Sequence, residues 1–205
     1  MAGAGSALAQ GAGSGAPTTL LALGDSLTAG YGLPQDQGFV PRLQAALRAK
    51  GRNVRVVNGG VSGDTMAGGL SRLDWLLAEN PRAAILALGA NDGLRGLPVP
   101  RMAQALDGIL DRLAARRIPV LLAGMFAPPN LGADYGRAFH AVFTEAAAKR
   151  NLLFMPFFLD GVAGERALNQ ADGIHPNARG VEEMVRRILP LTEDLLDRAA
   201  APPAG

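Results

Sequence analysis

From residue 18 onward, the chain alternates short apolar runs with longer amphipathic stretches. Short apolar runs bounded by turn residues are typical of buried strands, whereas apolar positions every three or four residues are typical of helices that cover a core. The pattern predicts strands at residues 18–23, 54–58, 83–89, 118–124 and 152–157. It predicts helices at about residues 38–50, 65–79, 99–116, 135–149 and 177–197.

This alternation of strands and helices indicates an α/β fold. Repeated strand-helix-strand units with right-handed crossovers build a parallel sheet with helices on both faces. We therefore expect a three-layer α/β/α sandwich with a five-stranded parallel sheet, formed by a single domain over residues 18–198. Residues 1–17 are rich in Gly, Ala and Ser without any charge, so we expect a flexible segment there. Residues 199–205 are expected to form a frayed tail.

Composition narrows the classes of function. The chain has 205 residues, of which 48% are hydrophobic, so one domain is able to bury a sizeable core. The net charge is only +2 and no basic run is interleaved with aromatic residues, so no nucleic-acid partner is expected. The absence of cysteine and the presence of only two histidines give no metal-binding pattern, and no metal is expected.

The sequence contains no apolar stretch of membrane-spanning length, so no integral membrane association is expected. An Ala-Leu-Ala tripeptide before Gln10 resembles a signal-peptidase site, although the basic and leucine-rich regions that normally precede such a site are missing. The segment is interpreted as an export remnant or a cloning scar. The expected location is periplasmic or secreted, with the cytoplasm as the alternative.

Candidate chemistry lies in the turns that follow the predicted strands, because open α/β sheets gather functional residues at the carboxyl ends of their strands. The first such turn, Gly-Asp-Ser-Leu at residues 24–27, places the hydroxyl of Ser26 directly after a strand. Gly, Asp and Ser are also ordinary turn and helix-capping residues. This segment alone therefore leaves a catalytic and a purely structural interpretation open.

A serine nucleophile needs a base within hydrogen-bonding reach and a third group that orients the base. His175 is the candidate base, and Asp172 stands three residues before it, where a turn could fold the carboxylate onto Nδ1. The alternative is an exposed loop histidine ahead of a helix, with Asp172 as a turn former. His140 stands in a helical pattern, where we expect a packing or surface role.

Acyl transfer also needs donors for the oxyanion of the tetrahedral intermediate. The candidates are the backbone N–H groups of Ser26 and Gly63 and the side-chain amide of Asn91, each in a turn after a predicted strand. The segments around Gly63 and Asn91 also suit a helix cap and a plain turn, respectively.

Taken in order, four of these turns resemble the blocks of the GDSL or SGNH hydrolase family. They are GDSL at residues 24–27, SGDT at 62–65, GAND at 89–92 and DGIHP at 172–176. The resemblance covers nearly all of residues 18–192 and is greatest to the bacterial arylesterase and multifunctional thioesterase/lysophospholipase group. It implies the flavodoxin-like SGNH-hydrolase form of the α/β/α fold and a serine esterase that uses no cofactor and acts on a small-molecule ester.

The resemblance also implies a role for each matching residue. Ser26 would be the nucleophile, His175 the general base and then acid, and Asp172 the carboxylate that orients His175. Ser26, Gly63 and Asn91 would donate to the oxyanion. Asp25 is expected beside the substrate, where it braces the turn through local hydrogen bonds and takes no part in proton transfer.

The segment at residues 125–136 is long for a connection between a strand and a helix, for which two to six residues are usual, and long loops are often binding loops. It carries the apolar side chains of Phe126 and Leu131 among prolines and glycines. In the resembling family the equivalent loop lines the acyl or alcohol pocket. We therefore expect Phe126 and Leu131 to contact substrate and to set the chain-length preference.

Three alternatives compete with the esterase. A carbohydrate O-deacetylase would use the same residues, but aromatic residues for stacking on sugars are few, and Trp75 lies in a helical core pattern. A nucleotide-binding module is disfavoured, because neither GxGxxG nor GxxxxGK[ST] occurs. A catalytically silent binding protein is disfavoured as well, because each of the four blocks keeps its reactive residue.

Overall fold

Five parallel strands form one sheet in residues 15–201, the part of the chain that the computed structural model describes. The strands are β1 Thr18–Gly24, β2 Val54–Gly60, β3 Ala83–Ala87, β4 Val120–Ala123 and β5 Leu153–Met155. Their order in the sheet is β2-β1-β3-β4-β5, so that β1 pairs with both β2 and β3. All five predicted strands are present, each within a few residues of its expected bounds.

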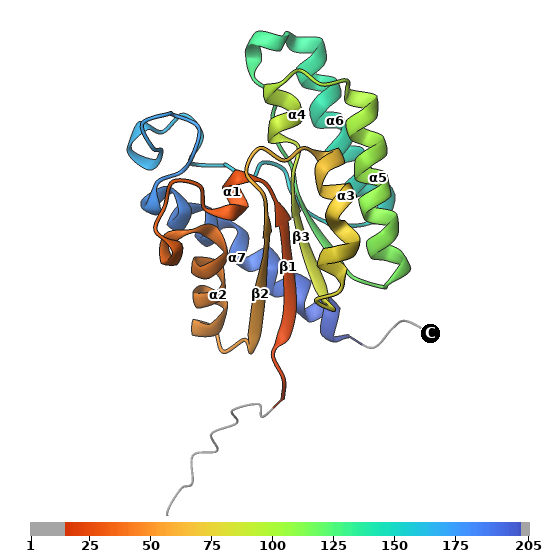
Figure 1. Ribbon diagram of the computed structural model, residues 1–205, viewed down its shortest axis with the longest axis vertical. Coiled ribbons are helices and arrows are strands. Elements are labelled where there is room, and N and C mark those ends of the chain that lie inside the picture. The colour runs from red at the N-terminus through yellow and green to blue at the C-terminus, as the bar shows by residue number, and fades with distance from the viewer. Residues whose placement is uncertain (1–14, 202–205) are drawn as a thin grey trace, which may run out of the picture.

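Helices cover both faces of the sheet (Figure 1). They are α1 Ser26–Ala29, α2 Phe39–Ala49, α3 Met66–Leu77, α4 Ala90–Leu94, α5 Val99–Ala115, α6 Ala133–Arg150 and α7 Ala178–Ala200. On one face α2 packs against α7, and on the other α3 and α6 pack against α5. The predicted three-layer α/β/α sandwich is therefore confirmed.

The central strands β1 and β3 are buried over most or all of their length because both of their faces are covered. Every residue of β3 is buried, and so are the last five residues of β1. A strand with one solvated face would alternate polar and apolar positions, whereas a parallel strand between two helical layers does not. The continuous apolar runs of the sequence thus reflect the helices on either side.

Two short helices, α1 and α4, occupy segments for which the sequence analysis predicted only turns. Each begins directly after a strand and runs for four or five residues. The last helix also differs from its expected bounds, because α7 continues through Ala200 and the side chain of Ala199 lies in the core. The frayed tail predicted from residue 199 therefore does not include the last turn of α7, and residues 202–205 lie outside the described range.

The position of Trp75 corrects a further expectation. Its side chain is 79% exposed and takes no part in the core. The buried positions of α3 lie along one stripe that includes Met66, Leu73 and Leu77. At 100° per residue, position 75 falls on the opposite side of the helix. Trp75 therefore faces solvent, although it stands among apolar neighbours in the sequence.

Two expectations concern the first residues of the chain. The predicted flexible segment lies outside the described residues except for positions 15–17, and the candidate signal-peptidase site lies outside them altogether. The periplasmic or secreted location therefore stays a prediction. In residues 15–201, no helix combines the length and the apolar character that a membrane crossing requires.

Candidate active site

The turns that follow β1, β2 and β3 meet at one edge of the sheet. Because β1 lies between β2 and β3, the strand order changes direction there, and ligands of open α/β sheets bind in the crevice at such a switch point. Ser26 follows β1, Gly63 follows β2 and Asn91 lies in α4 after β3. All three line one cavity of about 320 Å³, together with His175 from the segment before α7.

A tight turn at the end of β1 presents Ser26 to this cavity. A Cβ atom at Gly24 would lie 2.0 Å from the Oγ1 atom of Thr28, so the fold of α1 back onto the strand requires glycine. Asp25 caps α1, since its Oδ1 accepts a hydrogen bond of 3.0 Å from the N–H of Leu27. Ser26 therefore stands at the first position of a short, capped helix.

Ser26, His175 and Asp172 form a continuous chain of hydrogen bonds. Nε2 of His175 lies 2.9 Å from Oγ of Ser26, and Nδ1 lies 2.7 Å from Oδ2 of Asp172. The second carboxylate oxygen of Asp172 accepts the backbone N–H groups of Ile174 at 2.9 Å and of His175 at 3.0 Å. Hydrogen bonds from the backbone and side chain of His175, and then from Ile174, lower the pKa of Asp172 to about 2. Asp172 is therefore a carboxylate at neutral pH.

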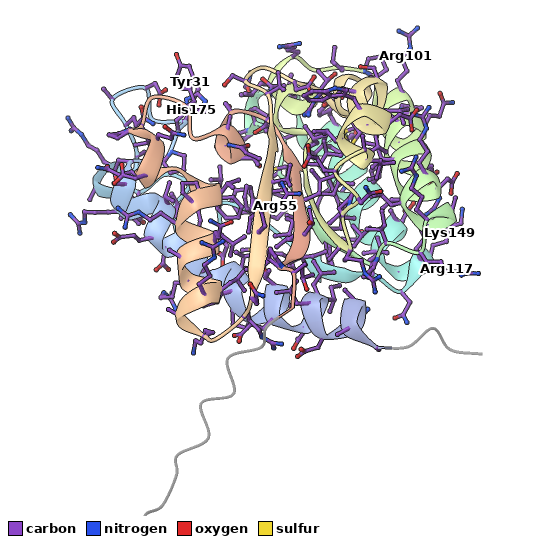
Figure 2. The ribbon with its side chains drawn as sticks, turned by 60° about the horizontal axis from the view of Figure 1, so that its bottom comes forward. Tyr31, Arg55, Arg101, Arg117, Lys149 and His175 are labelled. Carbon is purple, nitrogen blue, oxygen red and sulfur yellow. The ribbon has the colours of Figure 1, made fainter. Side chains whose placement is uncertain are left out.

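Two residues that the sequence analysis did not single out hold the His175 segment in place. The side-chain amide of Gln170 donates to the carbonyl oxygens of Tyr31 at 2.8 Å and of Pro176 at 3.0 Å. The ring of Tyr31 lies beside that of His175, with 4.6 Å between their centroids (Figure 2). Because Gln170 and Tyr31 are 139 positions apart, no local sequence pattern signals their contact.

Gly63 and Asn91 line the part of the cavity that is formed by the loop after β2 and by α4. Gly63 has a φ of +81°, in the left-handed region that favours glycine. Nδ2 of Asn91 donates to the backbone carbonyl of Asp64 at 2.9 Å, which ties α4 to the loop after β2. A guanidinium nitrogen of Arg95 donates to the carbonyl of Gly63 at 2.8 Å and adds a second tie between the same two segments.

Asp25 lies beneath the cavity and does not line it. Its side chain is fully buried, with Oδ2 3.5 Å from Nδ2 of Asn91, and the expected contact of Asp25 with substrate stays a prediction. The capping bond to α1 turns the carboxylate away from the cavity, as the predicted bracing of the turn requires. Burial raises the pKa of Asp25 to about 6.

In residues 15–201, no group of three His, Asp or Glu side chains is arranged to hold a metal ion.

Replacing Asp25 by asparagine is expected to stabilise the protein more at pH 7.5 than at pH 4.5. The ordinary pKa of Asp25 is 3.8 and the folded value is about 6, so the folded state binds the proton more tightly. The wild type therefore loses stability as the pH rises between these values, by up to about 3 kcal/mol. Asparagine keeps an oxygen for the N–H of Leu27 and carries no charge to bury. Urea unfolding of both proteins at the two pH values measures the difference, and an equal effect at both would contradict the expectation.

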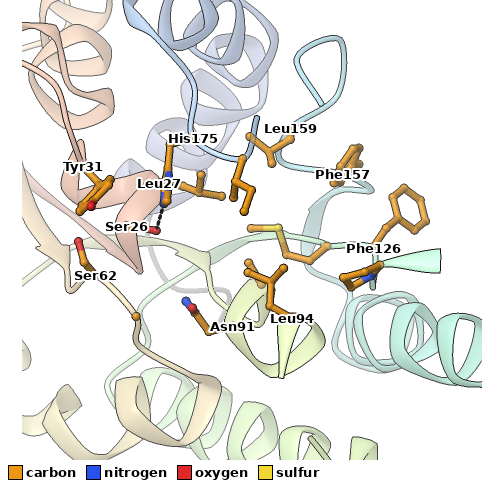
Figure 3. A pocket seen from close by; sticks show the side chains of 15 residues that line it. Ser26, Leu27, Tyr31, Ser62, Asn91, Leu94, Phe126, Phe157, Leu159 and His175 are labelled. Atoms are coloured by element: carbon orange, nitrogen blue, oxygen red, sulfur yellow. Dashed lines mark hydrogen bonds between the residues drawn. The ribbon is translucent and has the colours of Figure 1, made fainter. Parts of the chain in front are cut away.

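The rest of the cavity is mostly apolar and extends away from Ser26 (Figure 3). Phe126 lines its far end, with its ring 4.8 Å from that of Phe157, and its contact with substrate stays a prediction. Leu131 does not line it and lies instead near Gly96, and the expected contact of Leu131 with substrate stays a prediction. The loop turns away from the cavity at Pro128 and forms a short 3-10 helix that carries Leu131 outward. Lining residues that the sequence analysis missed are Tyr31, Leu94, Phe157, Leu159 and Ile174.

Comparison with known proteins places the chain in a family. The model of the GDSL-like lipase/acylhydrolase family matches residues 22–182. Esterase TesA of Pseudomonas aeruginosa is 43% identical over 182 residues, which are 88% of this chain and 90% of that protein. Thioesterase 1/protease 1/lysophospholipase L1 of Escherichia coli is 39% identical over 163 residues, which are 79% of this chain and 77% of that protein.

A solved structure shows the same architecture. The psychrotrophic esterase EstA from a Pseudoalteromonas species, in a form inhibited by monoethylphosphonate, is 35% identical. The match has a TM-score of 0.83 and covers 88% of this chain and 99% of that one. The family match extends from β1 to the first turn of α7 and so includes all four strand-end segments. The chain belongs to the GDSL-like lipase/acylhydrolase family.

Proposed function

We propose that this protein is a cofactor-independent serine esterase that hydrolyses acyl or aryl esters of short to medium chain length. The observation that carries the proposal is the hydrogen-bonded chain from Asp172 through His175 to Ser26, which ends on a hydroxyl inside a largely apolar cavity. A hydroxyl is a weak nucleophile at neutral pH, and an oriented imidazole is the group that activates it.

In the first step, Oγ of Ser26 attacks the ester carbonyl carbon while Nε2 of His175 takes the hydroxyl proton. The Asp172 carboxylate accepts the N–H of Nδ1, which fixes the tautomer that leaves Nε2 free to act as a base, and it stabilises the imidazolium that forms. The tetrahedral intermediate then collapses. The carbon–oxygen bond to the alcohol breaks, and Nε2 returns its proton to the leaving oxygen.

The negative charge of the tetrahedral intermediate needs donors opposite His175. Ser26, Gly63 and Asn91 line the cavity together, and their candidate donors are two backbone N–H groups and one side-chain amide. One N–H of the Asn91 amide is held by the carbonyl of Asp64, which orients the amide before substrate binds. The other N–H makes only a long contact of 3.5 Å to Oδ2 of Asp25, and we assign this N–H to the oxyanion. Such preorganised donors stabilise the transition state without reorganising during the reaction.

The second step releases the acid. Water takes the place of the alcohol, gives a proton to Nε2 of His175 and attacks the acyl carbon of the Ser26 ester. Collapse of the second tetrahedral intermediate breaks the bond to Oγ, and Nε2 returns the proton to Ser26. Each proton taken by His175 is thus given back, so the cycle needs no metal, cofactor or external base.

The shape of the cavity supports an apolar substrate. Leu94, Met125, Phe157, Leu159 and Ile174 surround the space beyond Ser26. Apolar walls favour acyl and aryl groups over acetylated sugars, whose hydroxyl groups would lose their hydrogen bonds to water here. The names of the relatives, an esterase and a thioesterase/lysophospholipase, agree with this substrate class.

The proposal is tested by a series of p-nitrophenyl and acyl-thioester substrates of increasing chain length, combined with covalent labelling. A fluorophosphonate is expected to attach to Ser26, as peptide mass spectrometry would show, and to stop hydrolysis in proportion to labelling. Saturable binding of esters without turnover would instead indicate a binding protein. A label on another serine would mean that Ser26 is not the nucleophile.

Replacing Asn91 by alanine is expected to lower kcat by about 10² to 10³ with little change in KM, because its amide acts on the oxyanion and not on the ground-state ester. Steady-state kinetics on a short p-nitrophenyl ester measure both parameters. A loss confined to KM would assign Asn91 to substrate binding instead.

A further inference from the structure

A second cavity, of about 460 Å³ and open to solvent over much of its extent, lies between the loop that follows β4 and the helix α6. The helix α6 provides most of its lining, including Gly136, His140 and Ala141. Phe126 lines this second cavity as well as the cavity at Ser26, and no other residue lines both. The side chain of Phe126 is therefore a wall that the two cavities share.

Few contacts hold this wall in place. The side chain of Phe126 is 51% exposed, and it touches two rings, stacking on His140 at a centroid distance of 4.3 Å and leaning on Phe157 at 4.8 Å. The ring of His140 is itself tied to the loop, since its Nδ1 lies 3.3 Å from the carbonyl oxygen of Met125. Exposed side chains change rotamer on the picosecond to nanosecond timescale. A rotation of Phe126 would break only these two ring contacts.

Each of the three polar side chains that line the second cavity makes one contact within the protein. Nδ1 of His140 faces the carbonyl oxygen of Met125, the hydroxyl of Thr144 donates to the carbonyl oxygen of Ala141, and Arg137 pairs with Asp134. What the lining offers a ligand is mainly the surface of an aromatic ring, alanines and a glycine. Such a surface suits a hydrocarbon chain, which makes no hydrogen bonds.

We propose that Phe126 is a movable wall and that the second cavity receives the far end of a medium-length acyl chain such as dodecanoyl. This inference rests on the proposed function, because the chain must begin at a carbonyl held by Ser26. The apolar arm of the first cavity leads from Ser26 past Leu94 to Phe126 (Figure 3). The first cavity alone is near the lower end of the range of small-molecule sites, roughly 300 to 1,000 Å³. With Phe126 turned aside, the combined space lies well within that range.

A substitution at Gly136, on α6, can test whether an acyl chain enters the second cavity. A Cβ atom built on Gly136 meets no other atom within 4 Å, so a larger side chain would enter open space without a clash. Leucine at this position would fill the second cavity and leave the first one untouched. Ala138, also on α6, is exposed and does not line either cavity, so it provides a matched control.

The experiment compares the wild type, Phe126→Ala, Gly136→Leu, the double variant and the control Ala138→Leu. The readout is the ratio of kcat/KM for p-nitrophenyl dodecanoate to that for the butyrate, with substrate kept below its aggregation limit. Each buried methylene is worth up to about fourfold. Phe126→Ala is therefore expected to raise the ratio by about tenfold or more. Gly136→Leu is expected to lower it in both backgrounds and to cancel the gain in the double variant, while Ala138→Leu keeps the wild-type ratio.

Two results would overturn the inference. One is a ratio that Gly136→Leu leaves unchanged in the Phe126→Ala background. The other is a change that depends on the length of the alcohol, in alkyl butyrates, and not on the length of the acyl chain. Neither result touches the proposed function, which fails only if the wild type does not hydrolyse the butyrate or if Ser26→Ala still does. Because Gly136→Leu is tested alone as well, the inference stays falsifiable if Phe126→Ala does not fold.

Discussion

A Ser26→Ala variant is expected to fold normally and to lose nearly all ester hydrolysis. Loss of the nucleophile of a serine hydrolase lowers kcat by about 10⁴ to 10⁶, and what remains comes from the oxyanion donors and from substrate binding. The fold is expected to survive because Ser26 is only partly buried and its hydroxyl bonds to Nε2 of His175. The turn itself is held by the Asp25 cap, which the substitution leaves in place.

Hydrolysis of p-nitrophenyl butyrate, thermal unfolding and ester binding measured on the same preparation separate lost chemistry from lost structure. Ser71→Ala is a matched control, since Ser71 is exposed on α3 and its hydroxyl donates only to the carbonyl of Gly68. The expected result is an inactive Ser26→Ala protein with wild-type unfolding beside a fully active control. Wild-type activity in a folded Ser26→Ala protein would refute the esterase mechanism.

Asp172 and His175 are expected to act as one unit. His175→Ala removes the base and is expected to cost about as much as Ser26→Ala, whereas Asp172→Ala leaves an imidazole with no fixed orientation or tautomer and costs about 10⁴. Since Asp172 acts through His175, the double variant should be little slower than His175→Ala alone. The geometry behind this expectation is the 2.7 Å contact between Nδ1 and the carboxylate.

The values of kcat/KM for the wild type, both single variants and the double variant form a double-mutant cycle. Asp74→Ala is a suitable control, because Asp74 is an exposed carboxylate on α3 that pairs with Arg112. If the two single losses multiplied in the double variant, Asp172 would act independently of His175, and the orienting role would be wrong.

The sequence predicted the architecture well because each signal is local. A strand buried on both faces must be apolar along its whole length, and a turn at its end needs glycine or short polar residues. The first requirement marks β3 and β4 and most of β1, and the second marks the turns after them, without knowledge of any distant contact. The spacing of Asp172 and His175 is local too, since a three-residue turn is enough to bring a carboxylate onto Nδ1.

Contacts between distant segments were decided only by the tertiary structure. Ser26 and His175 are 149 positions apart, and residue chemistry and family resemblance, not the local pattern, indicated that they meet. The supporting bond from Gln170 to Tyr31 carries no such signature and was missed. Which side chains face the cavity was likewise open, so that Phe126 lines it while Leu131 does not.

Asp25 and Trp75 show why the sequence alone did not predict the direction in which a side chain points. Asp25 is adjacent to the nucleophile in the sequence, yet the cap of α1 turns its carboxylate into the interior. Trp75 is apolar and stands among core residues, yet the rotation of α3 carries it to the solvent side. The sequence by itself determined which elements form and which turns carry reactive groups, because hydrogen bonding and burial within an element follow from neighbouring residues. The direction in which each side chain points from those elements depends on how whole helices pack against the sheet, and only the folded chain fixes that packing.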